Sequence, residues 1–280
     1  MIILEMGEQG GESFIILRKN SFLMKYILEN KGNRLFILLG SFFITNALVA
    51  EFVGVKIFSL EKVFGLIPVN LTLFGQGGLS FNLTAGVLLW PIVFVMTDII
   101  NEYYGKRGVR ILSFLAAGLI SYAFIIFFTA IHLPPADFWI NKNLPDGQVM
   151  NMNMAYNNVF GQGLWIIIGS LVAFLLGQMM DVFAFHFIKK KTGEKMIWLR
   201  ATGSTLISQF IDSFVVLYIA FYIGADWDLK LVLAIGVVNY IYKVAMAIVL
   251  TPVIYLVHGW IENYLGHEFA KEMKKEAIGE

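Results

Sequence analysis

Residues 164–191 read LWIIIGSLVAFLLGQMMDVFAFHFIKKK, an apolar stretch that ends in three lysines. About 20 mostly apolar residues are enough to cross a membrane as a helix. The stretch nevertheless carries Gln178 and Asp181 inside it, and the next apolar stretch carries Gln209 and Asp212 at the same spacing. A carboxylate in hydrocarbon is costly unless it meets water, a partner or a ligand. The repeated pair therefore indicates a solute site.

The composition sets the class of protein. Apolar residues make up 58% of the chain and charged residues 15%, whereas soluble domains carry about a quarter charged residues. The chain has no cysteine, which excludes disulfides, thiolate zinc sites and cysteine nucleophiles. No phosphate-binding loop or nucleic-acid motif is visible. We therefore expect an all-α integral membrane protein with no cofactor and no nucleic-acid partner.

Hydropathy predicts six transmembrane helices. A further stretch, 14–28, is too short and too interrupted by charge to be a seventh. The predicted organisation is a cytoplasmic N-terminal segment at 1–34, a six-helix transmembrane domain at 35–258 and a cytoplasmic tail at 259–280. The six predicted spans are 35–58, 82–104, 109–131, 164–188, 201–223 and 231–257.

Lysine and arginine predict the orientation. They gather before the first span, between the second and third, between the fourth and fifth, and after the sixth. Cytoplasmic segments carry the excess of these residues, so both termini are predicted to be cytoplasmic, in the cell inner (plasma) membrane. The three remaining loops hold only Lys56, Lys62, Lys142 and Lys230.

Two connections have a composition of their own. Segment 59–80 contains Gly65, Pro68 and three further glycines, and it reads either as an outer hairpin or as a re-entrant segment. The sequence leaves both possibilities open. The outer loop at 132–162 is rich in Asn, Pro and Met, and we expect it to hold a short helix.

Other spans also carry polar residues. Asn239 and Lys243 are four residues apart in the sixth span, so they share a helix face. The second span carries Asp98, and the first carries Asn46 and Glu51. Each has a structural alternative to a role in binding.

Those alternatives are local pairings. Lys243 would then serve to neutralise Asp181 or Asp212. Asp98 would cap a helix or pair with Arg107 or Arg110. Asn46 would form a hydrogen bond between helices.

The helical rise of about 1.5 Å per residue gives the relative depth of the two Gln–Asp pairs. In an antiparallel helix pair, Gln178 lies near the level of Asp212, and Gln209 lies near the level of Asp181. Either crosswise amide–carboxylate contacts form, or both pairs face one cavity. Lys243, in the sixth predicted span, lies close to mid-membrane.

Amide and carboxylate groups together suit a flat heterocycle, because they read its donor and acceptor edge. Aromatic residues of the spans, such as Phe214 and Tyr240, are candidates to sandwich such a ring. A buried carboxyl group can also take up a proton, so Asp181 and Asp212 are the candidates for proton coupling. The candidate substrate-binding residues are Gln178, Asp181, Gln209, Asp212, Asn239, Lys243, Asn46 and Asp98.

Four signatures resemble one family of transporters. They are Trp90–Gly105 (WPIVFVMTDIINEYYG), Gly177–Phe183 (GQMMDVF), Gly203–Ser213 (GSTLISQFIDS) and Asn239–Lys243 (NYIYK). In this order and spacing they are similar to the queuosine precursor transporter family, also called the vitamin uptake transporter family. The resemblance covers roughly residues 35–258.

The resemblance implies a six-helix inner-membrane importer of 7-deazaguanine bases, the precursors of the tRNA nucleoside queuosine. The precursor carried stays open, although an aminomethyl cation suits the excess of acid. The alternative is a substrate-binding membrane subunit of an energy-coupling vitamin uptake complex, so a homo-oligomer and an energising subunit both remain possible partners. An intramembrane enzyme is disfavoured, because glycine–aspartate and His-Glu-x-x-His motifs are missing.

Overall fold

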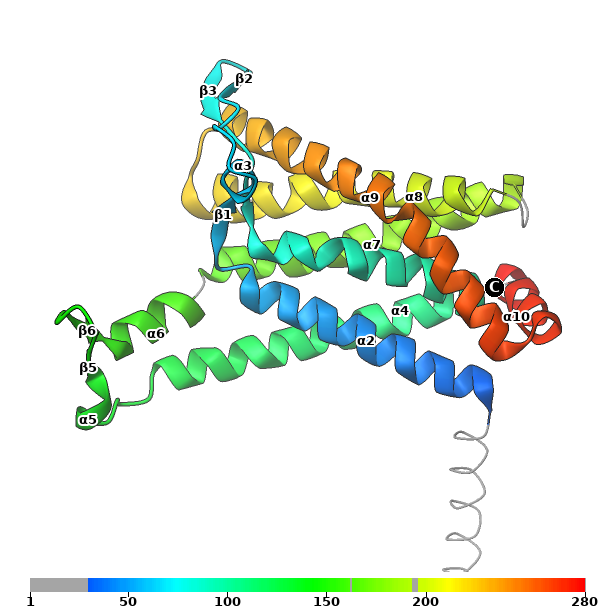
Figure 1. The fold of residues 1–280 in the computed structure, drawn as a ribbon, viewed down its shortest axis with the longest axis horizontal. Helices are drawn as coiled ribbons and strands as arrows, with labels where there is room; N and C mark the ends of the chain where they lie inside the picture. The colour runs from blue at the N-terminus through cyan, green and yellow to red at the C-terminus, as the bar shows by residue number, and fades with distance from the viewer. Residues whose placement is uncertain (1–29, 162, 193–195, 280) are drawn as a thin grey trace, which may run out of the picture.

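The computed structural model describes residues 30–161, 163–192 and 196–279. Its body is a bundle of long helices (Figure 1). Within the described residues, five helices are long and apolar enough to cross a membrane, as an all-α membrane protein requires. The predicted segment 14–28 lies outside the described residues. The five helices are Lys31–Val53, Trp90–Ile131, Met152–Thr192, Leu199–Ile223 and Leu229–Leu265.

The helices of the bundle begin and end within a few residues of the predicted spans, except at the start of the second span and at the end of the sixth. Helix α9 runs eight residues past the predicted end, and helix α10 follows it at once. The bundle consists of α2 (Lys31–Val53), α4 (Trp90–Ile131), α7 (Leu164–Thr192), α8 (Ile197–Leu217) with its π-helical continuation η2 (Tyr218–Ile223), α9 (Leu229–Leu265) and α10 (His267–Gly279).

Helix α4 reverses direction at its middle and so contains both the second and the third predicted span. Gly105 has non-helical dihedral angles, φ 63° and ψ −169°. Thr97 and Ser113, on either side of it, both donate to the same atom, Gln178 Oε1, at 2.9 and 3.5 Å. In a straight helix these residues would lie about 24 Å apart. The two halves of α4 therefore run side by side, as Figure 1 shows.

The Gly105 conformation yields a stability prediction. Its dihedral angles lie in a region that is open essentially only to glycine, so Gly105→Ala should destabilise the protein by about 1–3 kcal/mol. Thermal unfolding of the purified protein measures the loss. The matched control is Gly118→Ala in the same helix, where an added Cβ meets nothing within 4 Å. Equal melting temperatures for the two variants would contradict the strain at Gly105.

The start of the second predicted span is wrong by eight residues. Residues 82–89 form strand β4 (Asn82–Thr84) and the 3₁₀ turn η1 (Ala85–Leu88), and the helix begins only at Trp90. Pro91 occupies the first turn of the helix, where a missing N–H does no harm. Strand β4 pairs instead with β1 (Ile57–Ser59). Hydropathy alone does not separate the apolar 3₁₀ turn η1 from the helix that follows it.

Segment 59–80 forms a hairpin, which decides between the two alternatives. Short helix α3 (Leu60–Val63) is followed by strands β2 (Leu71–Leu73) and β3 (Gln76–Leu79), which pair antiparallel. The turn residues Phe74 and Gly75 both have positive φ, 52° and 79°, as a two-residue hairpin turn requires. Figure 1 shows the hairpin beside the start of α9, where Leu79 of β3 packs against Ala234 and Val238.

The loop at 132–162 holds helices, as predicted, together with a second hairpin at the same end of the bundle (Figure 1). Its elements are α5 (Asp137–Ile140), β5 (Asn141–Asn143), β6 (Val149–Asn151) and α6 (Met152–Phe160).

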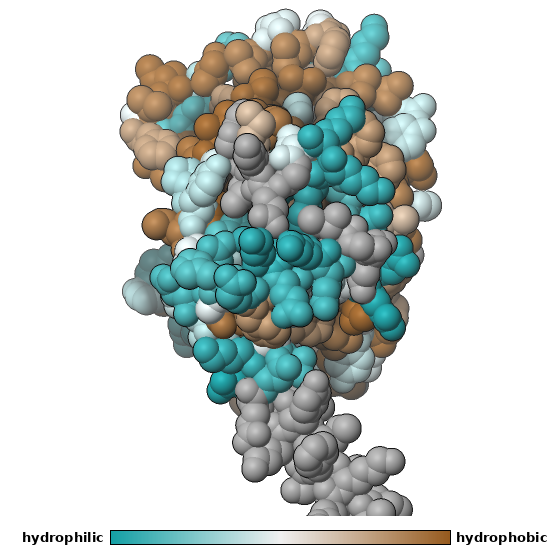
Figure 2. Space-filling view, turned by 90° about the vertical axis from the view of Figure 1, so that its right-hand side faces the viewer, coloured by the Kyte–Doolittle hydropathy of each residue, from teal (hydrophilic) through white to brown (hydrophobic). Residues whose placement is uncertain are grey.

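The opposite end of the bundle holds both ends of the described chain. Lys31, at the start of α2, donates to the carbonyl of Tyr264 at 3.0 Å, and α10 packs against α4 beside it. Figure 2 looks at this end and shows hydrophilic side chains gathered across it, with hydrophobic ones around them. We call it the basic end, because the described lysines and arginines of the predicted cytoplasmic segments lie on it.

Candidate functional site

A cavity of about 370 Å³ extends from the hairpin end into the bundle. We call it the central cavity. Its volume is in the range of small-molecule sites. Its polar and aromatic lining comes from α2, α4, α7, α8 with η2, and α9, together with Asn158 and the β1–β4 ribbon. The lining residues used below are Glu51, Trp90, Ser170, Asp212, Asn239 and Lys243.

An ion pair lies at the inner part of the central cavity. Lys243 of α9 donates to Asp212 of α8, and their side chains are only 10% and 15% exposed. Asn239 also lines the cavity, one helical turn before Lys243. Of the two carboxylates considered as partners for this lysine, the structure selects Asp212. Three predicted site residues are thus brought together at one cavity.

A second carboxylate reaches the same cavity. Glu51 of α2 is 7% exposed and lines the cavity together with Ser170 of α7. Among the described residues that line the cavity, two are therefore acidic, Glu51 and Asp212, and one is a lysine, Lys243. Glu51 was absent from the candidate site, although an acid inside an apolar span was the signal that could have placed it there.

The aromatic lining differs from the expectation. Phe214 and Tyr240 do not line the central cavity. Both pack on Phe210, whose ring centroid lies 4.8 Å from that of Phe214 and 5.4 Å from that of Tyr240. Trp90 and Phe221 line it instead. Trp90 also packs on Phe174, with ring centroids 5.5 Å apart, so its indole is held in place from behind.

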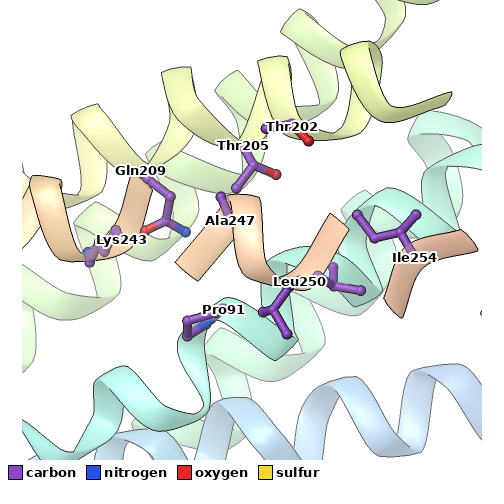
Figure 3. Close-up of a pocket in the computed structure, with 9 residues that line it drawn as sticks. Pro91, Thr202, Thr205, Gln209, Lys243, Ala247, Leu250 and Ile254 are labelled. Carbon is purple, nitrogen blue, oxygen red and sulfur yellow. The ribbon is translucent and has the colours of Figure 1, made fainter. Parts of the chain in front are cut away.

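A narrow passage continues from Lys243 towards the basic end, between α4, α8 and α9 (Figure 3). Its free volume is about 10 Å³, which is room for about one water molecule. Gln209 lies beside Lys243 here, and its Oε1 has no hydrogen-bond partner within the described residues. The central cavity is therefore wide on the hairpin side of Lys243 and nearly closed on the other side.

Asp98 and Asp181 form a separate cluster with hydroxyl groups between α4, α7 and α8. Ser204 and Thr205 donate to the two oxygens of Asp98, each at 3.2 Å. Ser208 donates to Asp181 at 3.0 Å. The two aspartates are 1% and 0% exposed. We call these five residues the carboxyl–hydroxyl cluster.

The carboxyl–hydroxyl cluster contains no cation. Asp98 was considered as a partner of Arg107 or Arg110, and that pairing is wrong, because hydroxyls occupy both of its oxygens. Neither aspartate forms an ion pair with a lysine or arginine in the described part of the chain. Two adjoining buried carboxyl groups without a counter-charge are suited to holding a proton.

The relative depths of the two Gln–Asp pairs are as predicted, but their contacts are not. Ser208, next to Gln209, bonds Asp181, and Gly177, next to Gln178, lies beside Asp212. The idea that both pairs face one cavity is wrong, because of the four only Asp212 lines the central cavity. Residues three apart on a helix point about 60° away from each other. On α7 this separation directs Gln178 towards α4 and Asp181 towards α8.

Two more predicted residues make local contacts. Gln178 is 2% exposed and accepts from Thr97 and Ser113 of α4. Asn46 is 8% exposed and donates to the carbonyl of Phe42 in its own helix at 2.8 Å. Within the described residues, Asn46 makes no hydrogen bond to another helix.

A buried ionic cluster at the basic end was not anticipated. Glu102 of α4 lies 3.0 Å from Lys189 Nζ of α7 and 2.7 Å from an Arg200 nitrogen of α8. All three side chains are about 1% exposed. Beside it, His186 contacts Asn101 at 2.9 Å. Glu102 therefore joins three helices at the end opposite to the central cavity.

Comparison with known proteins places these features in one family. Residues 84–257 match the family described as "Putative vitamin uptake transporter". This stretch contains all four sequence signatures, Asp212, Lys243 and the carboxyl–hydroxyl cluster. No solved structure matches the chain.

Three curated relatives carry similar names. A probable queuosine precursor transporter of Bacillus subtilis is 28% identical over 189 residues, 65% of this chain and 76% of the relative. One of Haemophilus influenzae is 26% identical, over 71% of this chain and 80% of the relative. The queuosine precursor transporter of Escherichia coli is 26% identical, over 61% and 70%. Since the family match spans more than half of its length, this chain belongs to the vitamin uptake transporter family.

Proposed function

We propose that this protein is a multi-pass importer of queuosine precursors, the 7-deazaguanine bases, and not an enzyme. The curated relatives named as queuosine precursor transporters support this substrate class. The domain that carries transport is 35–258, in the cell inner membrane.

The proposed topology has six crossings with both termini cytoplasmic. Three observations support it. The halves of α4 run in opposite directions about Gly105, so this helix supplies two crossings. The start of α2 and the end of α9 contact each other at one end of the bundle. That end carries most of the lysine and arginine residues, as cytoplasmic segments do.

The central cavity is the proposed substrate site, and its ion pair is the observation that carries the proposal. A carboxylate, an ammonium and the Asn239 amide line one buried wall, which supplies donors and acceptors for the edge of a flat base. Trp90 offers a ring face to stack on it. Glu51 adds a second acidic residue to the lining of the cavity, which suits the aminomethyl cation among the precursors.

Precursor uptake in a host that cannot synthesise queuosine tests the proposal. The queuosine content of tRNA is the readout, and membrane abundance of the protein is measured alongside it. We expect the chain to restore the modified nucleoside when a 7-deazaguanine precursor is supplied. Failure to restore it, with normal abundance in the membrane, would refute the substrate class. Uptake by the purified chain in proteoliposomes shows whether an energising subunit is needed.

Proton coupling is proposed for the carboxyl–hydroxyl cluster. An inward-directed proton gradient should accelerate uptake into proteoliposomes, because the buried carboxyl groups can bind a proton without a resident cation. Asp181→Asn removes one of the two carboxyl groups while keeping the shape, so it should abolish the acceleration. The control is Asp146→Asn in the β5–β6 turn. If an imposed pH gradient did not change the rate of uptake by the unmodified protein, the proposed proton coupling would be contradicted.

A further inference from the structure

A second cavity, apart from the central one, lies between the second half of α4 and α7. Its volume is about 500 Å³. Lys106 and Arg110 of α4, which follow the Gly105 reversal at the basic end, line it. The remaining lining is apolar except for Ser113 and Gln178. We call this cavity the flank groove, and its apolar residues are Val109, Phe114, Leu175, Met179, Val182 and Phe183.

The two cations of the flank groove are available for an external anion. Lys106 and Arg110 are four residues apart, so they lie one above the other on the same helix face. Neither forms an ion pair with a carboxylate of the described residues. The nearby acids are engaged elsewhere, because Glu102 binds Lys189 and Arg200, and another acid of this end, Glu262, binds Lys274.

The bottom of the groove offers an unpaired hydrogen-bond donor. Gln178 uses its Oε1 to accept from Thr97 and Ser113, while its Nε2 has no partner within the described residues. The side chain is 2% exposed. A buried amide N–H without a partner costs free energy, which an oxygen of a bound molecule would offset.

The flank groove opens on the side of the bundle and not towards the ends. Phe114, Met179 and Phe183 on its rim are 58%, 63% and 65% exposed. On a membrane-spanning helix such side chains face lipid acyl chains. An occupant that enters from this side is therefore a component of the bilayer.

We propose that the flank groove binds an anionic phospholipid. The phosphate lies on Lys106 and Arg110, since basic pockets between helices on the cytoplasmic side attract anionic headgroups. An acyl chain follows the apolar wall formed by Phe114, Met179 and Phe183. The Gln178 amide donates to an ester oxygen of the same lipid. This site requires only that the protein spans a membrane, so it stands independently of the solute that is carried.

Native mass spectrometry of the full-length protein in detergent tests the lipid site. Phosphatidylglycerol is titrated against phosphatidylcholine with the same acyl chains. K106Q/R110Q should weaken phosphatidylglycerol binding by about tenfold or more, because each cation near the membrane surface contributes about a fivefold attraction. The matched control, K190Q/K275Q, removes two exposed lysines of the same end that do not line the groove, and it should keep the binding.

Three outcomes would overturn the proposal. The first is equal loss in K106Q/R110Q and the control, which would indicate a diffuse charge effect. The second is equal binding of phosphatidylcholine to the unmodified protein. The third is displacement of phosphatidylglycerol by soluble glycerol phosphate, which would make the site one for a free phosphate. Val182→Trp fills the groove and leaves both cations, so it should also weaken lipid binding even if K106Q/R110Q fails to fold.

Discussion

Asp212→Asn should reduce precursor uptake about 100-fold. The substitution leaves the Lys243 ammonium in a site where its side chain is only 10% exposed, without its counter-charge. Losing one partner of a buried charge pair in a binding site costs about 2–5 kcal/mol of binding free energy, and each 1.4 kcal/mol corresponds to a tenfold change. Initial rates of uptake, with queuosine in tRNA as a second readout, measure the loss.

The controls separate binding from stability. Asp228→Asn makes the same chemical change at the N-cap of α9, where asparagine caps as well as aspartate, and it should leave uptake intact. The double variant Asp212→Asn/Lys243→Met removes both charges and should restore stability without restoring uptake. Recovery of uptake in the double variant would mean that the pair serves the fold alone. Full uptake by Asp212→Asn would refute the site.

The bundle could be predicted because its signals are local and strong. Long apolar stretches locate the helices, and the spacing of lysine and arginine predicts which ends lie together. The chain turns back at Gly105, just before a group of basic residues. The predicted spans 82–104 and 109–131 therefore correspond to the two halves of α4. What hydropathy could not supply is the start at Trp90, because the 3₁₀ turn η1 just before it is as apolar as the helix that follows.

The candidate site could be predicted only in part. Asp212, Asn239 and Lys243 reach the central cavity as their depth and spacing suggested. Gln178 and Asp181 do not, since the direction of a side chain around a helix depends on which neighbours that helix packs against. Partners such as Ser208 were invisible for the same reason, because serine in an apolar stretch is common and carries no charge to signal its role.

Glu102→Gln is the substitution with the largest expected effect on stability, a loss of about 3–5 kcal/mol. It leaves Lys189 and Arg200, both about 1% exposed, as two buried cations without the acid that joins them. Thermal unfolding in detergent and the amount of protein in the membrane report the loss. Glu262→Gln is the matched control at the same end. Its side chain is 30% exposed and it pairs with Lys274, so the loss there should stay below about 1 kcal/mol.

The double variant Glu102→Gln/Lys189→Gln decides whether charge or shape causes the loss. The cluster of Glu102, Lys189 and Arg200 carries one net positive charge, and in Glu102→Gln it carries two. Removing Lys189 as well returns the cluster to one positive charge on Arg200, so part of the stability should return. A double variant that is less stable than Glu102→Gln would show that the contacts of Lys189 with α4, such as its contact with the Glu102 carbonyl at 3.5 Å, matter more than its charge. Recovery would assign to Glu102 the role of holding α4, α7 and α8 together by charge at the end opposite to the central cavity.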